Sequence, residues 1–309
     1  MKEKPSGTDF SRLSAAVFMW DIWYACNYRC SYCPWEMSKS WEAMAKKHRV
    51  ISPAEWIACW ERMHRKYDSS HVYFIGGEPL LYPRIDEILE ALSRKHYLSV
   101  ITNLSMPIDA ARRLVQKLPP ERVRFGASFH PEFSDLDQFL EKLAVFQEAD
   151  FQVWASMVAW PPFIGEIKKY MDVFESRGIG LDLQTFFGTY QGKSYPLDYT
   201  REEKLAISPY IADILKPHGL GQEPTLGKPC GSGHIYSKIL GNGDVYRCGS
   251  VVDYDSPAPM GNILDPDFEL WAGPTPCPRR TCDCGESRYL WENYVKEHPA
   301  ATSSRACSP

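Results

Sequence analysis

The sequence lacks any apolar run long enough to cross a membrane as a helix, which takes roughly 18 residues. The most apolar stretch near its start, SAAVFMWDIWYAC, is interrupted by Asp21. The first residues, MKEKPSGTDFSRLS, also lack the apolar core of a signal peptide. We therefore expect a cytoplasmic protein without a membrane partner.

An excess of one charge sign is also missing. The 309 residues include 35 Lys and Arg against 39 Asp and Glu, interspersed along the chain, for a formal net charge of -4. Such a chain offers no polycation to neutralise phosphates, so we do not expect a nucleic acid partner. With 44% hydrophobic residues it can bury a substantial core. Length and composition favour one large domain with a smaller appendage.

Apolar runs alternate with helix-forming segments through the first two thirds of the chain. Capping boxes at Ser52-Pro53-Ala54-Glu55 and Thr200-Arg201-Glu202-Glu203 indicate two of the helix starts. The runs that read as strands are residues 16–24, 71–77, 97–103, 122–129, 151–159 and 180–188. Six such units predict an α/β fold with a parallel sheet, either doubly wound or curled into a partial barrel. Ligands of these sheets bind at the carboxyl ends of the strands.

The pattern changes after about residue 215. Glycine and proline become frequent, and HIYSKIL-GNG-DVYRC reads as a β-hairpin. We place a boundary in KPHGLGQEPTLGKP, which divides the chain into domains 1–215 and 216–309. The second domain is too short and rich in loops to be stable on apolar burial alone, so we expect a metal bound by its cysteines to stabilise it.

Nine of the ten cysteines form two groups, and in a reducing cytosol clustered cysteines are ligands or catalysts more often than disulfides. Cys59 stands apart in AEWIACWERM, where we expect a small buried apolar side chain. Cys307 is close to the end of the chain and is expected to take no part in a site. The first group is Cys26, Cys30 and Cys33, and the second is Cys230, Cys248, Cys277, Cys282, Cys284 and Cys307.

The first group has the spacing CxxxCxxC directly after the first expected strand. Three thiolates at this spacing can hold three irons of a [4Fe–4S] cube and leave the fourth iron open to a small ligand. The alternatives are a zinc site or buried thiols. Zinc needs a fourth protein ligand, and the nearest histidine, His48, lies fifteen residues beyond Cys33.

Together with Gly76-Gly77-Glu78-Pro79 after the second strand, this motif resembles the radical S-adenosylmethionine (AdoMet) superfamily. The resemblance implies a partial (β/α)6 barrel in which a [4Fe–4S] cluster on Cys26, Cys30 and Cys33 binds AdoMet. It also implies that Tyr32 lies near the adenine, and that Gly76, Gly77 and Glu78 bind the methionine amino group. Glycine permits close approach of the backbone, and a carboxylate complements an ammonium.

The later strands supply further candidates. Ser128 lies where the superfamily often has a serine that contacts AdoMet, and Asn103 and Ser156 are cofactor candidates by their strand-end positions. His130 stands where members often have aspartate, and its role is either to cap a turn or to act in catalysis. Possible substrate contacts near the sixth strand, with core or loop roles as the alternative, are Asp182, Gln184 and Tyr190.

The second cysteine group resembles the auxiliary-cluster domains called SPASM and twitch. The full SPASM pattern has seven cysteines, whereas this stretch offers five, or six with Cys307, so the shorter twitch arrangement with one extra [4Fe–4S] cluster fits better. The implied ligands are Cys230, Cys248, Cys282 and one of Cys284 or Cys277. A structural zinc is the alternative.

The resemblance extends to the radical AdoMet dehydrogenases and epimerases of aminoglycoside biosynthesis. It implies that a 5′-deoxyadenosyl radical takes a hydrogen atom from a carbon of a polar small molecule of the sugar, aminoglycoside or cyclitol type. An auxiliary cluster then accepts an electron, or a spare thiol, Cys277 or Cys284, returns a hydrogen atom. An electron donor such as flavodoxin or ferredoxin is implied as a partner.

Two other functions stay open. Peptide maturases of the SPASM type are the first, although the first expected strand begins about sixteen residues in, which leaves no room for a domain that grips a leader peptide. A non-catalytic iron–sulfur or zinc protein is the second, but it would have no need of GGEP beside an open cluster.

Overall fold

The computed structural model describes residues 10–34, 50–211, 223–249, 258–282 and 288–298. Cys284 and Cys307 therefore lie outside the described residues. All six strands expected from the sequence are present: β1 (Val17–Trp23), β2 (His71–Gly76), β3 (Tyr97–Thr102), β4 (Val123–Ser128), β5 (Gln152–Val158) and β6 (Leu181–Gln184).

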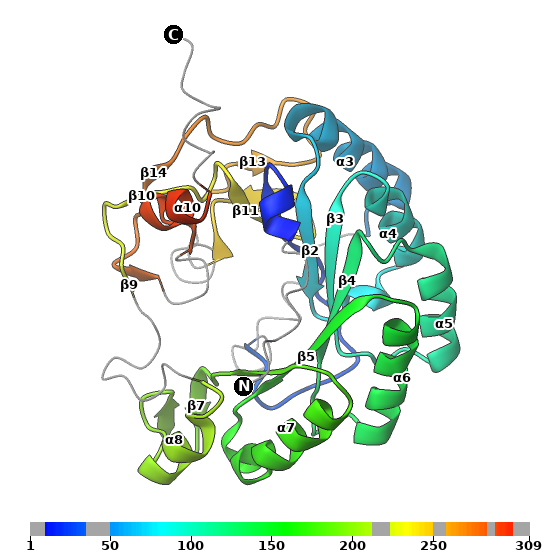
Figure 1. The fold of residues 1–309 in the computed structure, drawn as a ribbon. Coiled ribbons are helices and arrows are strands. Elements are labelled where there is room, and N and C mark those ends of the chain that lie inside the picture. The colour runs from blue at the N-terminus through cyan, green and yellow to red at the C-terminus, as the bar shows by residue number, and fades with distance from the viewer. Residues whose placement is uncertain (1–9, 35–49, 212–222, 250–257, 283–287, 299–309) are drawn as a thin grey trace.

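Helices follow most of these strands and cover the outer face of the sheet (Figure 1). Both predicted capping boxes are confirmed, at Ser52 with Glu55 and at Thr200 with Glu203. The helices are α3 (Pro53–Tyr67), α4 (Ile85–Ser93), α5 (Ile108–Lys117), α6 (Leu136–Glu148), α7 (Ile167–Ser176), α8 (Arg201–Ile207) and α10 (Trp291–Glu297), with 3₁₀ turns η1 (Phe10–Leu13), η2 (Pro79–Leu81) and η3 (Pro161–Glu166).

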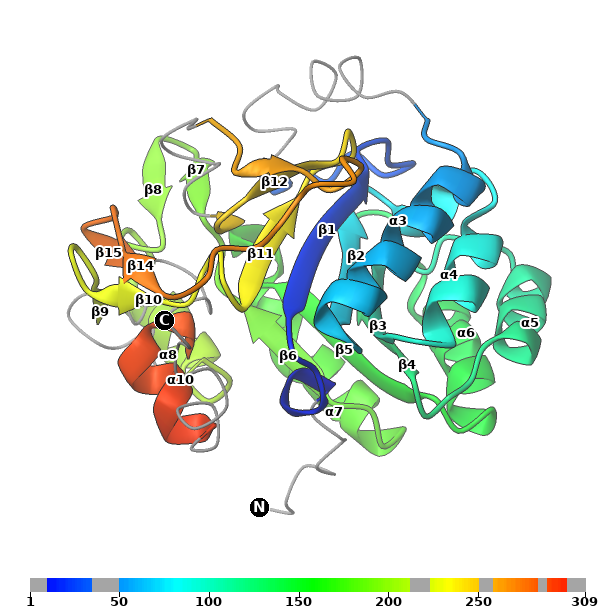
Figure 2. The same cartoon turned by 90° about the horizontal axis from the view of Figure 1, so that it is seen from above.

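Within the described ranges one sheet has the order β13-β12-β11-β1-β2-β3-β4-β5-β6. Its six strands from β1 to β6 are parallel and form the partial (β/α)6 barrel. The expected hairpin is confirmed as β11 (Tyr236–Ile239) and β12 (Asp244–Tyr246), and β13 is Gly261–Asn262. β11 pairs in parallel with the free edge of β1, so the hairpin extends the barrel sheet (Figure 2). The division into domains 1–215 and 216–309 stays a prediction.

The remaining strands are short and lie outside the large sheet. β7 (Gly188–Tyr190) pairs with β8 (Lys193–Tyr195), β10 (Pro229–Cys230) with β14 (Thr275–Pro276), and β9 (Glu223–Pro224) with β15 (Thr281–Cys282). The last two pairs carry two of the C-terminal cysteines.

Aromatic side chains fill the layer between the sheet and α3. The ring of Trp20 on β1 lies 4.5 Å from Trp56, 5.5 Å from Trp60 and 5.0 Å from Phe74. All four are fully buried, and burial of each is worth on the order of 2–3 kcal/mol. This layer holds β1 rigid just before the cysteine loop.

A C-terminal segment packs along the side of α3 that carries Cys59, Arg62 and Lys66. Arg62 donates to the carbonyl of Ile263 at 2.7 Å, and Lys66 donates to that of Phe268 at 2.8 Å. Cys59 is buried, as expected, and its thiol also donates to Ile263 O at 3.1 Å. These contacts fix the segment after β13 against the first helix of the barrel.

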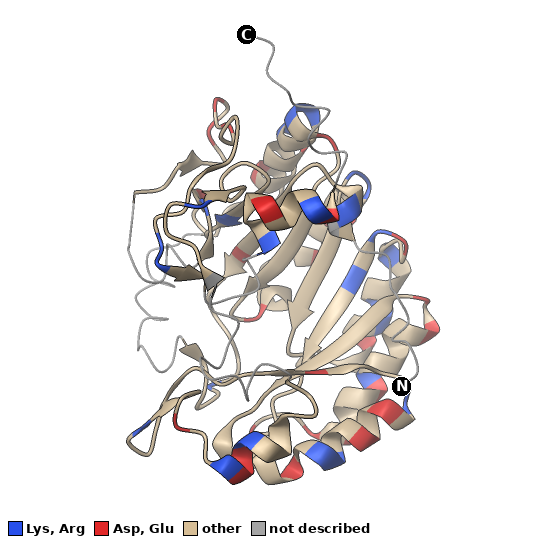
Figure 3. Cartoon of the chain, turned by 60° about the vertical axis from the view of Figure 1, so that its left-hand side comes forward, with Lys and Arg blue, Asp and Glu red and all other residues tan. Residues whose placement is uncertain are grey.

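Charged residues of both signs alternate along the outer helices (Figure 3). Among the described residues, no helix is both long enough and apolar enough to pass through a bilayer.

Candidate active site

The loop after β1 carries the first cysteine group and is held by hydrogen bonds within the loop and to Glu132. Cys33 N donates to Cys30 O at 2.9 Å, and Arg29 Nη1 donates to Cys26 O at 2.5 Å. The thiol sulfur of Cys26 accepts from Tyr28 N at 3.3 Å. A carboxylate from the barrel, Glu132, accepts from the backbone N–H of Ser31 at 2.8 Å. The cysteines are therefore presented on a loop with defined geometry.

The two glycines after β2 pack directly against this loop. Gly77 N donates to Trp23 O at 2.7 Å, and a Cβ on Gly77 would lie 2.5 Å from Ala25 O. Gly76 has φ of 128°, and a Cβ there would lie 2.1 Å from Trp23 O. Only glycine allows the end of β2 to approach the chain that leads to Cys26 so closely.

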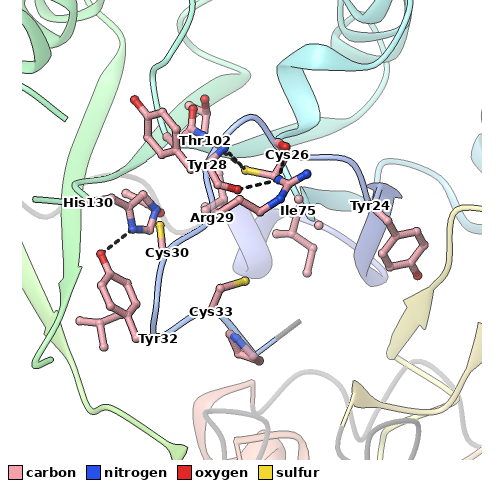
Figure 4. Close-up of a pocket in the computed structure, with 17 residues that line it drawn as sticks. Tyr24, Cys26, Tyr28, Arg29, Cys30, Tyr32, Cys33, Ile75, Thr102 and His130 are labelled. Atoms are coloured by element: carbon pink, nitrogen blue, oxygen red, sulfur yellow. Dashed lines mark hydrogen bonds between the residues drawn. The ribbon is translucent and has the colours of Figure 1, made fainter. Parts of the chain in front are cut away.

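A cavity of about 230 Å³ opens at the carboxyl ends of the strands, beside the cysteine loop (Figure 4). It gathers most of the residues that the sequence singled out. Those lining it are Cys26, Cys30, Tyr32, Cys33, Gly76, Gly77, Asn103, Ser128 and His130. Ser156 and Glu78 are not part of the lining.

Glu78 lies behind the cavity wall, with 1% of its surface exposed. Its carboxylate accepts from Thr102 Oγ1 at 2.7 Å and from Asn103 N at 2.7 Å, and also from Leu80 N at 3.0 Å. Burial raises the pKa of Glu78, and these hydrogen bonds oppose the rise. The carboxylate thus ties the end of β2 to the end of β3. Its expected contact with the AdoMet amino group stays a prediction.

Asn103 begins a polar row across the ends of the strands. Its Nδ2 donates to Asn27 Oδ1 at 3.2 Å and lies 3.7 Å from Cys26 Sγ. Strand pairing places Ser128 beside Ser156, and Ser156 beside Asp182. Side chains in register on neighbouring strands share a face, so hydroxyl and carboxylate groups continue from the cavity towards β6.

Tyr32 and His130 form one unit in the cavity wall. The Tyr32 hydroxyl lies 3.0 Å from His130 Nδ1, and the two rings stack at 5.8 Å. Burial lowers the pKa of His130 to about 4, so the imidazole is neutral near pH 7. The backbone of His130 also caps a turn, since its carbonyl accepts from Phe133 N at 2.9 Å. The turn is therefore seen at His130, and a role of this residue in catalysis stays a prediction.

The substrate candidates near β6 are less tightly grouped. Gln184 is exposed and is in register with Val158, which lines the cavity. Tyr190 packs its ring 4.5 Å from Trp160, and Trp160 lies 5.6 Å from Tyr32. An aromatic path therefore runs from the hairpin β7–β8 to the cavity wall.

The thiols suit an iron–sulfur cluster better than a single ion. Among the described residues, no three His, Cys, Asp or Glu side chains converge where one metal ion could bind. A cube takes each thiolate on a different iron, so its ligands need only surround a common space. Burial raises the pKa of Cys26 and raises that of Cys30 to about 12. These groups need a nearby cationic centre to ionise.

The second cysteine group also meets around one cavity. Four cysteines line it, from β10, from the chain after β12, from the chain after β14, and from β15. They are Cys230, Cys248, Cys277 and Cys282. Ser232 N lies 3.5 Å from Cys230 Sγ, and the Cys277 thiol donates to Thr225 Oγ1 at 3.5 Å. None of the described cysteines forms a disulfide.

Several residues of these sites escaped the sequence reasoning. Tyr24, Tyr28 and Arg29 line the first cavity, and Arg247 and Arg279 line the second. For the first three a signal existed, because they lie within or directly before the cysteine motif. Arg247 directly precedes Cys248 and Arg279 lies between Cys277 and Cys282, but the spacing of these cysteines does not indicate that either arginine lines the cavity.

Comparisons with known proteins agree with this fold. Two solved structures have a similar fold. One is anSMEcpe with bound AdoMet and the Cp18Cys peptide, at 16% identity and a TM-score of 0.57, and the match covers 81% of this chain and 77% of that chain. The other is anSMEcpe with bound AdoMet, at 15% identity and a TM-score of 0.57, and the match covers 90% of this chain and 82% of that chain. No curated protein matches the sequence. Residues 20–171 match the model of the Radical SAM superfamily, which indicates a radical SAM domain in this part of the chain and therefore an enzyme.

Proposed function

We propose that this protein is a radical AdoMet oxidoreductase that dehydrogenates a carbon of a polar small molecule, of the sugar, aminoglycoside or cyclitol type. The observation that carries the proposal is the presence of two separate cysteine-lined cavities, the first after β1 and the second at the short strands β10 and β15. A cytoplasmic location and an electron donor such as flavodoxin or ferredoxin form part of the proposal.

Cys26, Cys30 and Cys33 would hold the first [4Fe–4S] cluster, with AdoMet in the cavity beside Tyr32, Gly76 and Gly77. When bound, the pair supplies reductive cleavage of AdoMet and a 5′-deoxyadenosyl radical. The protein's own contribution is to position the substrate C–H bond and to exclude water. Glu78, bonded to Thr102 and to Asn103 N, keeps the strand ends that form the cavity in register.

The polar row supports the substrate class. Ser128 lies in the cavity wall, and Ser156 and Asp182 follow it across the strand ends. Hydroxyl groups donate and accept hydrogen bonds, and a carboxylate accepts from hydroxyl or ammonium groups. Such a row is complementary to a substrate that carries several hydroxyl or amino groups.

The second cavity supports dehydrogenation over epimerisation. It would hold an auxiliary [4Fe–4S] cluster on Cys230, Cys248, Cys277 and Cys282, which makes Cys277 a ligand and not a free hydrogen-atom donor. Four thiolates leave no iron open, so such a centre suits electron transfer. Cys284 is the remaining candidate donor for an epimerase.

Peptide maturation is the second candidate. The observation that favours it is the similarity in fold to anSMEcpe, which has been solved with a bound peptide. Anaerobic turnover with the Cp18Cys peptide and with a panel of aminocyclitols separates the two candidates, because each predicts product from one set alone.

Metal content tests the proposal as a whole. Anaerobically reconstituted protein should hold about eight irons per chain, since each cube contributes four. Replacement of Cys26, Cys30 and Cys33 together by alanine should leave about four and abolish AdoMet cleavage. Four irons per chain, with zinc bound at the second cysteine group, would contradict the auxiliary iron–sulfur cluster. AdoMet cleavage by the triple variant would contradict the assignment of Cys26, Cys30 and Cys33 to the catalytic cluster.

Turnover in deuterated water tests the type of reaction. Dehydrogenation predicts a product lighter by two hydrogens, with no solvent deuterium fixed at carbon. Epimerisation predicts one deuterium at the inverted carbon, together with a cysteine variant that keeps both clusters and stops after forming 5′-deoxyadenosine. The second pattern would replace dehydrogenation by epimerisation and leave the radical chemistry intact.

A further inference from the structure

Two arginines stand in the wall of the cavity that gathers the C-terminal cysteines. Besides Cys230, Cys248, Cys277 and Cys282, this wall contains Arg247, Arg279 and the hydroxyl residues Thr225, Ser232 and Thr281. No carboxylate from the described residues lines it. The charge of the wall is therefore positive, apart from the thiols themselves.

Arg247 is held rigidly in this wall. Its Nη1 donates to Pro276 O at 2.9 Å, and Nη2 lies 3.5 Å from Thr275 O. The guanidinium also lies 5.3 Å from the centre of the Trp271 ring, a cation–π contact. Both carbonyls precede Cys277, and Arg247 directly precedes Cys248, so one guanidinium links two of the cysteine-bearing segments.

The support beneath Arg247 is itself fixed. Trp271 N donates to Gly233 O at 2.9 Å, and Trp271 O accepts from His234 Nδ1 at 2.7 Å. The indole occupies the space that a Cβ on Gly233 would fill, with a ring carbon 2.4 Å away. A cation held this way keeps its position whatever the charge of the neighbouring centre, and its electrostatic effect is preorganised.

We propose that Arg247 and Arg279 set the reduction potential of the centre bound by these cysteines and make it an acceptor of electrons. This inference rests on the auxiliary cluster of the proposed function. Reduction of a [4Fe–4S] centre by one electron adds one negative charge to a site that four thiolates already make anionic. Nearby cations stabilise the more negative form, which raises the potential.

A raised reduction potential favours electron transfer from the substrate radical to this centre. Oxidation of a substrate radical releases one electron and one proton, and the electron needs an acceptor that takes it readily. A wall with two cations and hydroxyl groups near the sulfurs favours uptake of that electron. A centre of purely structural function would need its four ligands but no particular potential.

The test is a potentiometric titration monitored by electron paramagnetic resonance, with dithionite as reductant. The protein titrated is the full-length chain in which Cys26, Cys30 and Cys33 are replaced by alanine, so that only the auxiliary centre contributes to the signal. Arg247→Met and Arg279→Met should each lower the equilibrium constant for reduction at least tenfold, which for one electron is 59 mV. Arg247→Lys, which keeps the charge, should recover part of the shift.

Arg280→Met is the matched control, because Arg280 is exposed and lies outside the cavity wall. It should leave the potential unchanged. Equilibrium constants for reduction that stay within twofold of the parent's in both Arg279→Met and Arg247→Met, with iron content intact, would overturn the inference and leave the auxiliary cluster in place. Absence of iron from the triple cysteine background would overturn both.

Discussion

The Lys238 ammonium lies 2.8 Å from a carboxylate oxygen of Asp21, a residue 217 positions earlier in the chain. Their side chains are 13% and 2% exposed. The other oxygen of Asp21 lies 3.4 Å from the hydroxyl of Tyr24, which lines the catalytic cavity. This buried pair therefore connects the C-terminal hairpin with the strand that leads into the cysteine loop.

Removing one partner of this ion pair should lower the free energy of unfolding. Lys238→Met leaves the Asp21 carboxylate buried without its counter-charge, and we expect a loss of about 3–5 kcal/mol in unfolding free energy. Lys228→Met is the control, because the ion pair of Lys228 with Glu292 is exposed and should contribute less than about 1 kcal/mol. Denaturant titration of both variants measures the difference.

A double replacement separates the effect of charge from that of packing. Asp21→Leu combined with Lys238→Met removes both charges, and it should be clearly more stable than Lys238→Met alone. Equal stability of Lys238→Met and Lys228→Met would contradict a buried pair of this kind.

The glycines after β2 allow a sharp test of the cavity geometry. Gly77→Ala places a methyl group 2.5 Å from Ala25 O, so the chain that leads to Cys26 must shift. We expect at least a tenfold loss of AdoMet affinity, measured by equilibrium binding under anaerobic conditions. Gly180→Ala, where nothing lies within 4 Å of the added carbon, should bind AdoMet as the parent does. Similar affinities in the two variants would show that the close contact is not required.

Cys277 and Cys59 form a matched pair of thiols with different expected roles. Cys277 lines the C-terminal cavity, whereas Cys59 is a buried residue of α3 whose thiol is bonded to Ile263 O. Cys277→Ala should lower iron from about eight to about four per chain if it is a cluster ligand. Cys59→Ala should keep the full iron content. Full iron in Cys277→Ala would assign the fourth ligand to another residue.

His96 should make stability depend on pH. Its Nδ1 accepts from Ser70 N at 3.1 Å, which leaves the proton on Nε2, 3.2 Å from Trp60 O. Burial lowers the pKa of His96 to about 4, below the roughly 6.5 of an unfolded histidine. The unfolded state therefore binds more protons as pH falls below about 6.5, and this group destabilises the fold until pH reaches about 4.

Between pH 7 and pH 5 this linkage amounts to about 2 kcal/mol. His96→Asn should be less stable than the parent at pH 7 but should lose less stability on acidification. Denaturant midpoints of both proteins at several pH values give the two slopes. Parallel slopes would show that His96 carries no such linkage.

The local part of this structure could be predicted from the sequence. Strands β1 to β6 follow from apolar runs bounded by capping boxes and turns, and the hairpin β11–β12 follows from its Gly-Asn-Gly turn. Each of these signals involves only a few neighbouring residues, so it can be recognised from local composition and spacing. The CxxxCxxC loop and the glycines after β2 were equally visible, and the structure brings them to one cavity.

Pairings between distant segments could not be predicted in the same way. Nothing local to Tyr236–Ile239 says that β11 joins β1, or that Lys238 reaches Asp21. The contact of Glu78 with AdoMet, which the family resemblance implies, stays a prediction, and its hydrogen bonds to Thr102 and Asn103 N at the end of β3 could not be predicted from the sequence. Cys277 lines the second cavity through a similar convergence, and the position of Cys284 lies outside the described residues.

The pairing of β1 with β11 also bears on how the chain is made. β1 is among the first strands to leave the ribosome, and its partner on one edge, Tyr236–Ile239, is among the last. At 5–20 residues per second, that edge stays bare for roughly 10–40 s. An apolar strand with open backbone donors and acceptors is a template for association with other chains. Truncation before Tyr236 would make this exposure permanent, so such shortened chains should accumulate as insoluble protein even though every residue of the radical SAM domain is present.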